Sequence, residues 1–108
     1  MIWALTDRYC GKLLFIRAGH ELSLQFHRVK DETLFVQDGR LEVEIGDAGD
    51  AVRNSEVVAP GASFRIAPGT VHRLRAVSDT VVLEVSTPEV DDIVRLEDAY
   101  GRRGETDR

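Results

Sequence analysis

Residues 19–45 read GHELSLQFHRVKDETLFVQDGRLEVEI, and this stretch decides the fold class. Polar and apolar residues alternate in residues 22–27 and again in residues 41–45, and a period of two is typical of β-strands. Asp38-Gly39 lies between two such runs and favours the tight turn of a β-hairpin. The stretch therefore predicts β structure, with a hairpin centred on Asp38-Gly39.

The same pattern continues on both sides of this stretch. Turn residues separate the expected strands, which span residues 13–17, 22–27, 34–37, 41–45, 57–59, 63–66, 72–76 and 81–85. Because so many strands cannot lie in one flat sheet, we expect an all-β sandwich or barrel of jelly-roll type. We expect one domain over residues 1–108, with a core at about 11–87. The tail, residues 88–108, would add one short strand and a helical turn.

Composition and charge exclude several classes of partner. The formal charge is −5 and the charged residues are interspersed, so no basic stripe is available to nucleic acid. The apolar start of the chain is too short for a signal peptide or a membrane span, which predicts a soluble cytoplasmic protein without a membrane partner. The single cysteine, Cys10, excludes an intramolecular disulfide and favours a reducing compartment.

Several polar residues in these strands are candidates for chemistry. Side chains alternate between faces along a strand, so one face of residues 22–27 carries Ser23, Gln25 and His27, and the other carries Leu22, Leu24 and Phe26. An ordinary half-exposed strand would bury the apolar face and leave the polar face in water. Glu32 opens the next strand and His72 follows the Pro68-Gly69 turn, which favours the opposite interpretation, with the polar face inside.

The spacing of these residues resembles that of the cupin superfamily. The first cupin motif is matched by Gly19, Gln25-Phe26-His27, Glu32 and Gly39, with Gln25 in place of the first histidine. The second motif is matched by Gly61, Pro68-Gly69 and His72, with Ala67 in place of a proline. The resemblance implies a single-domain jelly-roll β-barrel that holds one metal ion through Gln25, His27, Glu32 and His72.

The chemistry of these ligands limits the choice of metal. Imidazole nitrogens and a carboxylate suit Zn²⁺, Mn²⁺, Fe²⁺, Co²⁺ or Ni²⁺, and such a set leaves room for water or substrate. Because Glu32 is the only charged ligand, one divalent ion would keep about one net positive charge to polarise a carbonyl or hydroxyl. His20 lies in a turn and is not expected to be a ligand.

A polar inner face has a consequence for the outer face of the barrel. Leu22, Leu24 and Phe26 would then face outward together with Phe35, and a soluble monomer rarely exposes such an apolar patch. We therefore expect a two-fold homodimer formed by these sheet faces.

A closer similarity concerns residues 22–27, 67–74 and 91–102, which resemble the C-terminal domain of type II mannose-6-phosphate isomerases. The similarity extends from about residue 11 to 102. The wider phosphomannose isomerase group also places a Gln-x-His pair on its metal, which supports Gln25 as a ligand. Two positions depart from the family: Lys30 stands where it has an arginine, and Thr33 where it has a histidine.

This resemblance implies a metal-dependent isomerase of a small sugar or sugar phosphate. The candidate catalytic residues are Glu84, as a base on a strand where burial would desolvate its carboxyl, and Lys30. Lys30 and Arg95, with Arg17, are the candidates for binding phosphate. Two alternatives stay open: a non-catalytic cupin that binds a metal and a sugar, and a small Fe²⁺ dioxygenase.

Overall fold

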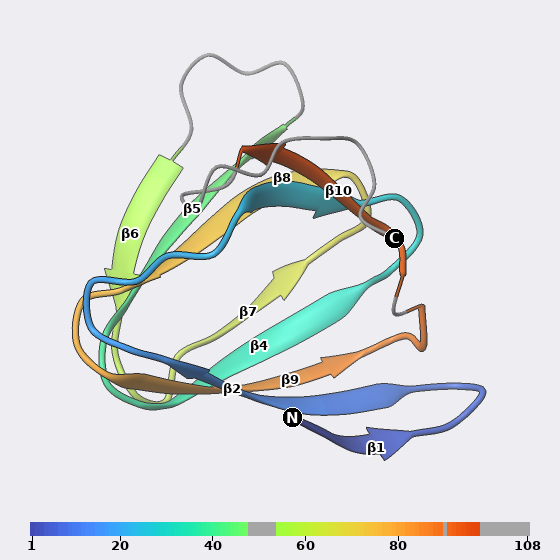
Figure 1. Cartoon of the computed structure of the whole chain (residues 1–108), viewed down its shortest axis with the longest axis horizontal. Coiled ribbons are helices and arrows are strands. Elements are labelled where there is room, and N and C mark those ends of the chain that lie inside the picture. Colours follow the sequence, from blue (N-terminus) through green and yellow to red (C-terminus); the bar gives the residue numbers. More distant parts are fainter. Residues whose placement is uncertain (48–53, 90, 98–108) are drawn as a thin grey trace.

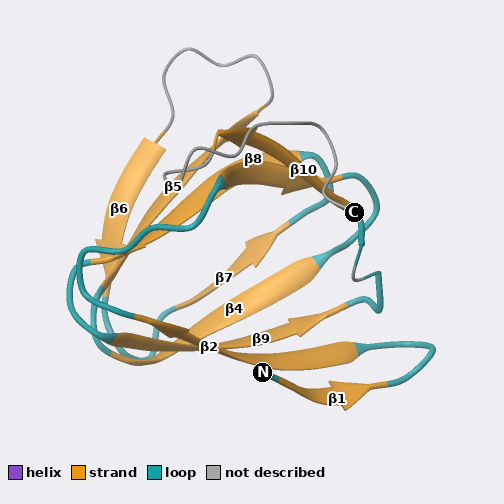
Figure 2. Cartoon of the chain, in the orientation of Figure 1, coloured by secondary structure: helices purple, strands orange, loops and turns teal. Residues whose placement is uncertain are grey.

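Two antiparallel sheets of five strands face each other in the computed structural model, which describes residues 1–47, 54–89 and 91–97 (Figure 1). The first sheet has the order β1 (Ile2–Leu5), β2 (Cys10–Ile16), β9 (Thr80–Ser86), β4 (Glu32–Asp38) and β7 (Ser63–Ile66). The second has the order β10 (Ile93–Glu97), β3 (Leu24–His27), β8 (Thr70–Ala76), β5 (Leu41–Asp47) and β6 (Asn54–Val58). The prediction of an all-β fold is confirmed, since the described residues contain no helix (Figure 2).

The core lies between the two sheets and comes from the inward half of each alternating strand. Leu34 and Val36 on β4 are 2% and 0% exposed, and they meet Leu41 and Val43 on β5, which are 0% and 5% exposed. Burying one such side chain stabilises the fold by about 1.5–3 kcal/mol. At the end of the sandwich where polar residues replace these apolar ones, the inner faces enclose a cavity instead.

All eight strands expected in the middle of the chain are present, but the hairpin prediction is wrong. β4 and β5 follow each other around Asp38-Gly39, yet β4 pairs with β7 and β9 whereas β5 pairs with β6 and β8. Gly39 has a φ of 87°, while no described non-glycine residue has a positive φ, so the turn is not type I′. A Cβ at Gly39 would also collide with the Asp79 carbonyl oxygen, so the chain crosses between sheets at a point that only glycine fits.

The prediction that Leu22, Leu24 and Phe26 face out of the barrel is wrong for Leu22. Leu24 and Phe26 do alternate with the cavity-lining Gln25 and His27, but they do not form an open patch. Leu22 lies ahead of β3, where its N–H bonds the Leu74 carbonyl at 2.9 Å, and its side chain packs against the core. Leu24 is 6% exposed and Phe26 is half-buried. Of the four residues in that predicted patch, only Phe35, at 40% exposed, lies open to solvent.

The ends of the described chain add one strand to each sheet. β1 pairs with β2 at the edge of the first sheet and was not predicted. β10 pairs with β3 and is the short strand expected in the tail. The helical turn predicted after it lies outside the described residues. No described segment forms a helix with the length and apolar character needed to cross a membrane.

Candidate metal centre

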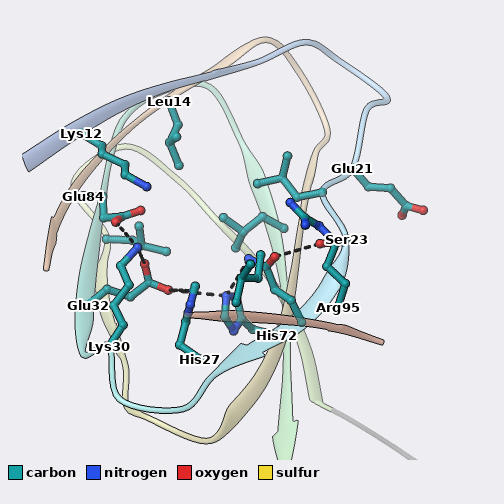
Figure 3. A pocket seen from close by; sticks show the side chains of 15 residues that line it. Lys12, Leu14, Glu21, Ser23, His27, Lys30, Glu32, His72, Glu84 and Arg95 are labelled. Carbon is teal, nitrogen blue, oxygen red and sulfur yellow. Dashed lines mark hydrogen bonds and ion pairs between the residues drawn. The ribbon is translucent and has the colours of Figure 1, made fainter. Parts of the chain in front are cut away.

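A cavity of about 320 Å³ opens between the two sheets and collects most of the predicted site residues (Figure 3). Its walls come from β2, β9 and β4 on one side and from β3, β8 and β10 on the other. Among its lining residues are the four predicted metal ligands, Gln25, His27, Glu32 and His72. A volume at the lower end of the range for ligand sites suits one small molecule.

Three of these ligands converge on one point. Glu32 Oε2 lies 3.5 Å from His27 Nε2 and 3.5 Å from His72 Nε2, and one ligand atom from each residue lies within 4.8 Å of the others. The three residues are 8%, 5% and 2% exposed in chain order. Each comes from a different strand: His27 ends β3, Glu32 begins β4, and His72 lies on β8.

Local backbone structure brings the two histidines together. Gly69 adopts a φ of 84° in the turn before β8, a conformation that side chains disfavour. Its N–H donates to the His27 carbonyl at 2.7 Å, and Thr70 N–H closes the turn on the Ala67 carbonyl at 3.1 Å. The glycine of the second motif is therefore bonded directly to the histidine of the first.

The protonation states of this cluster favour a metal ion. His72 Nδ1 lies 3.0 Å from the Thr70 carbonyl oxygen, which can only accept, so Nδ1 carries the proton and Nε2 presents its lone pair to the cluster. Burial lowers the pKa of His72. Burial alone would raise the pKa of Glu32, but its hydrogen bond with His27 and the charge of Lys30 lower it to about 2. A buried carboxylate with two imidazoles is a donor set that fits a divalent ion.

Gln25 lies beside this cluster, as predicted for the fourth ligand. It is paired with His72 in the β3–β8 register, and its Nε2 lies 3.4 Å from His72 Nε2. Its Oε1 accepts a hydrogen bond from Ser23 Oγ at 2.8 Å. Turning the amide by half a turn would direct Oε1 toward the cluster and keep the bond to Ser23, since a hydroxyl both donates and accepts.

The two candidate catalytic residues form a buried ion-pair network with the candidate ligand Glu32. Lys30 Nζ lies 2.9 Å from Glu84 Oε2 and 3.5 Å from Glu32 Oε1, and all three residues are at most 5% exposed. Burial would lower the pKa of Lys30, but the two glutamates outweigh it and raise the pKa above its ordinary value of 10.5. Lys30 is therefore a charged ammonium held between two carboxylates (Figure 3).

The remaining predicted residues divide between the cavity and the surface. Arg95, on β10, lines the cavity. Arg17 is exposed in the turn after β2 and does not line the cavity. Lys12, on β2, lines the cavity but was missed, because the predicted strand began one residue later. Extending the alternation of Leu14 and Ile16 back by one step would have found it.

Comparisons with known proteins agree with this geometry. A family model described as a cupin domain matches residues 13–87. No curated protein sequence matches the chain. Among solved structures, the chain is similar to KdgF from Halomonas sp., at 25% identity and a TM-score of 0.72, over 85% of this chain and 79% of that one.

Two further structures share the fold at lower identity. One is a cupin superfamily protein from Desulfitobacterium hafniense, at 15% identity and a TM-score of 0.70, covering 82% of this chain and 75% of that one. The other, from Acidithiobacillus ferrooxidans, is described provisionally as a sugar phosphate isomerase, at 16% identity and a TM-score of 0.67, covering 80% and 55%. With two facing antiparallel sheets, both motifs at one cavity, and the family model matching most of its length, the chain belongs to the cupin domain family.

Proposed function

We propose that this chain is a metal-dependent isomerase that interconverts the aldose and ketose forms of a small sugar or sugar phosphate. The observation that carries the proposal is Glu84, a buried carboxylate that opens on the cavity of the metal ligands without belonging to their cluster. A site that only binds a metal has no need of a second buried carboxylate, because burying a charge is costly. An enzyme that moves a proton between carbons does need such a carboxylate, as its general base.

The chemistry required is a proton shift between two neighbouring carbons. Converting an aldose to a ketose removes the proton from carbon 2 and returns one to carbon 1, while a hydroxyl proton passes between the two oxygens. A divalent ion bound at the site would supply positive charge to the carbonyl and the adjacent hydroxyl. Glu84 would take the carbon-bound proton and return it.

Lys30 has a positioning role in this proposal. Its ammonium holds the Glu84 carboxylate at 2.9 Å and connects it to Glu32, so the base and the metal ligand keep a fixed relation. We do not assign phosphate to Lys30, because two carboxylates already satisfy its charge. The resemblance to type II mannose-6-phosphate isomerases, itself a prediction from the sequence, is what favours this reaction type, and the sugar also stays a prediction.

The first experiment measures metal content by plasma mass spectrometry on protein purified without a metal-chelating tag. About one equivalent of a divalent metal is expected in the native protein and none in the His27→Ala/His72→Ala double variant. If the native protein holds no metal even after reconstitution, the metal-dependent isomerase is excluded, and the remaining hypothesis is a cupin that binds a ligand without metal.

The second experiment tests catalysis with Zn²⁺-loaded protein under nitrogen. Aldose and ketose phosphates incubated in ²H₂O should gain deuterium at carbon 1 or 2, as followed by proton NMR. Glu84→Gln should slow this exchange by about 10²–10⁴-fold with metal content unchanged. Glu42→Gln, on β5 outside the cavity, is the control.

Two results would replace this proposal with one of its alternatives. Tight metal binding without exchange in any sugar or sugar phosphate would identify a binding cupin. Sustained oxygen consumption with Fe²⁺ would identify the dioxygenase.

A further inference from the structure

The formal charges of the residues that line the cavity sum to zero when no metal is bound. Among the described residues, three cations and three anions line it: Lys12, Lys30 and Arg95, against Glu21, Glu32 and Glu84. With both histidines as neutral ligands, the sum is zero, and one divalent ion raises it to +2. A cleft with this net charge favours an anionic ligand, because a cleft lined by charge of one sign raises the local concentration of ions of the opposite sign.

The lysines of the chain are concentrated at this site. The sequence contains only two, Lys12 and Lys30, against twelve arginines, and both lysines line the cavity. A lysine ends in a compact ammonium, which binds an oxyanion as a point charge and needs less room than a guanidinium. The distribution places the two compact cations of the chain in the cavity that also contains the candidate metal ligands.

The two lysines are in different electrostatic situations. Lys30 is 4% exposed and its ammonium lies between Glu32 and Glu84. Lys12 is half-buried and faces the cavity from β2, directly opposite Glu84 in the β2–β9 register (Figure 3). Within the described part of the chain, Lys12 takes part in no ion pair or side-chain hydrogen bond. Its ammonium is therefore available to a ligand.

We infer that the metal-loaded cavity binds a small molecule that carries an oxyanion, a carboxylate or a phosphate, and that Lys12 contacts this group. The inference rests on the metal site of the proposed function and narrows its substrates to anionic ones. A sugar acid and a sugar phosphate both present this chemistry to Lys12, so the probes must separate them.

The test titrates Zn²⁺-loaded full-length protein by calorimetry with matched probes. Glucose 6-phosphate is compared with glucose, gluconate with sorbitol, and inorganic phosphate is added alone. At least one anion should bind about tenfold or more tightly than its neutral counterpart. Lys12→Met should remove that preference and leave zinc content unchanged, whereas Arg8→Met, which removes the same charge from the exposed β1–β2 turn, should keep it.

A second measurement observes the Lys12 amine directly in the otherwise native sequence. Reductive methylation with ¹³C-formaldehyde labels lysines and the N-terminal amine, so Lys12 gives one of at most three kinds of signal. The Lys12 methyl signal, assigned by its loss in Lys12→Met, should shift when the preferred anion is added and not when the neutral probe is added.

The outcomes separate this inference from the proposed function. Equal affinity for every anion and its neutral counterpart, or a preference that survives Lys12→Met with no shift of the Lys12 signal, overturns the inference and leaves the isomerase proposal standing. Anion preference without deuterium exchange overturns the isomerase and leaves the inference standing. A chain that holds no metal overturns both.

Discussion

Lys30 shows how one residue can connect the stability of the barrel to the chemistry of its cavity. Its ammonium is the nearest cation to both Glu32 and Glu84 among the ion pairs of the described residues, and each of the three side chains is almost fully buried. A buried charge left without its partner loses both the attraction and the contact with water. The three residues therefore depend on one another for their stability in the interior.

Replacing Lys30 by methionine should strongly destabilise the metal-free protein. Two buried carboxylates would then face each other without a cation, and breaking a buried pair costs about 3–5 kcal/mol. Urea denaturation at pH 7 in the presence of a chelator measures the change. The double variant Lys30→Met/Glu84→Gln removes one of the stranded charges and should recover part of the loss. Unchanged stability in Lys30→Met would mean that water reaches these carboxylates.

At the scale of elements, the segment between β3 and β4 is held in place from the far end of the described chain. Asp92, just before β10, accepts backbone N–H bonds from Arg28 at 3.1 Å, Val29 at 2.7 Å and Lys30 at 2.7 Å. This segment connects His27 to Glu32, so Asp92 supports the spacing of two candidate metal ligands. Burial would raise the pKa of Asp92, but these N–H bonds outweigh it and hold the pKa below its ordinary value of 3.8.

Asp92→Asn should destabilise the protein at pH 7 by about 1 kcal/mol, because an amide oxygen is a weaker acceptor than a carboxylate. A carboxyl whose pKa is lower in the folded state stabilises the fold above its unfolded pKa, and this contribution is lost as pH falls through the folded pKa. The difference between wild type and Asp92→Asn should therefore shrink below about pH 3.8. Urea denaturation from pH 7 to pH 3 measures it, with the exposed neighbour Asp91→Asn as control. A difference that stays constant with pH would contradict this role.

The strands, and the convergence of the candidate ligands His27, Glu32 and His72, could be predicted from the sequence, whereas the pairing of strands could not. The alternation of polar and apolar residues along a strand indicates which residues are buried. The spacing of the two motifs alone identifies His27, Glu32 and His72 as candidate ligands. Which strand lies beside β4 depends on β9, whose residues are far away in the chain. The hairpin at Asp38-Gly39 failed for this reason, because a turn signal does not tell whether the chain turns within a sheet or crosses to the other one.

At the scale of the whole molecule, the three candidate metal ligands come from both sheets. Glu32 belongs to the first sheet, and His27 and His72 belong to the second. An ion held by all three therefore connects both halves of the barrel. Any ligand that binds only the folded state stabilises it in proportion to its concentration above the dissociation constant.

Zinc should therefore stabilise the native protein against urea by about 2.7 kcal/mol when the free metal is 100 times its Kd. The His27→Ala/His72→Ala variant should show the same urea midpoint with zinc and with chelator. A zinc effect that persists in this variant would place the stabilising metal elsewhere.

The homodimer stays a prediction, but the surface on which we expect the two copies to meet is now a different one. On β2, β9 and β4, the residues that point away from the core are mostly apolar, and the charged exception is the exposed Asp38 at the end of β4, which pairs with Val81. The apolar members of this face include Leu13, Phe15, Val81, Leu83, Val85 and Phe35. Phe15 is 77% exposed and Val85 is 54% exposed. We propose that a second copy packs on this face, because a two-fold axis would bury its exposed apolar side chains against the same side chains of the other copy.

Light scattering at micromolar concentration should give twice the chain mass of 12.1 kDa. Phe15→Lys/Phe35→Lys should give a folded monomer by the same measurement and by circular dichroism. Val57→Lys, an exposed apolar site on β6 in the other sheet, should remain a dimer. A monomeric wild type would exclude the dimer.

The strand order also determines how much of the chain must be synthesised before the barrel can form. β9 is the central strand of the first sheet and joins β1-β2 to β4-β7, while β8 is the central strand of the second and joins β10-β3 to β5-β6. During synthesis, strands made earlier wait with unpaired edges until residues 70–86 have left the ribosome. Such non-local pairing is typical of domains that fold in milliseconds to seconds rather than microseconds. We therefore expect the nascent chain to be most exposed to aggregation just before β8 and β9 emerge.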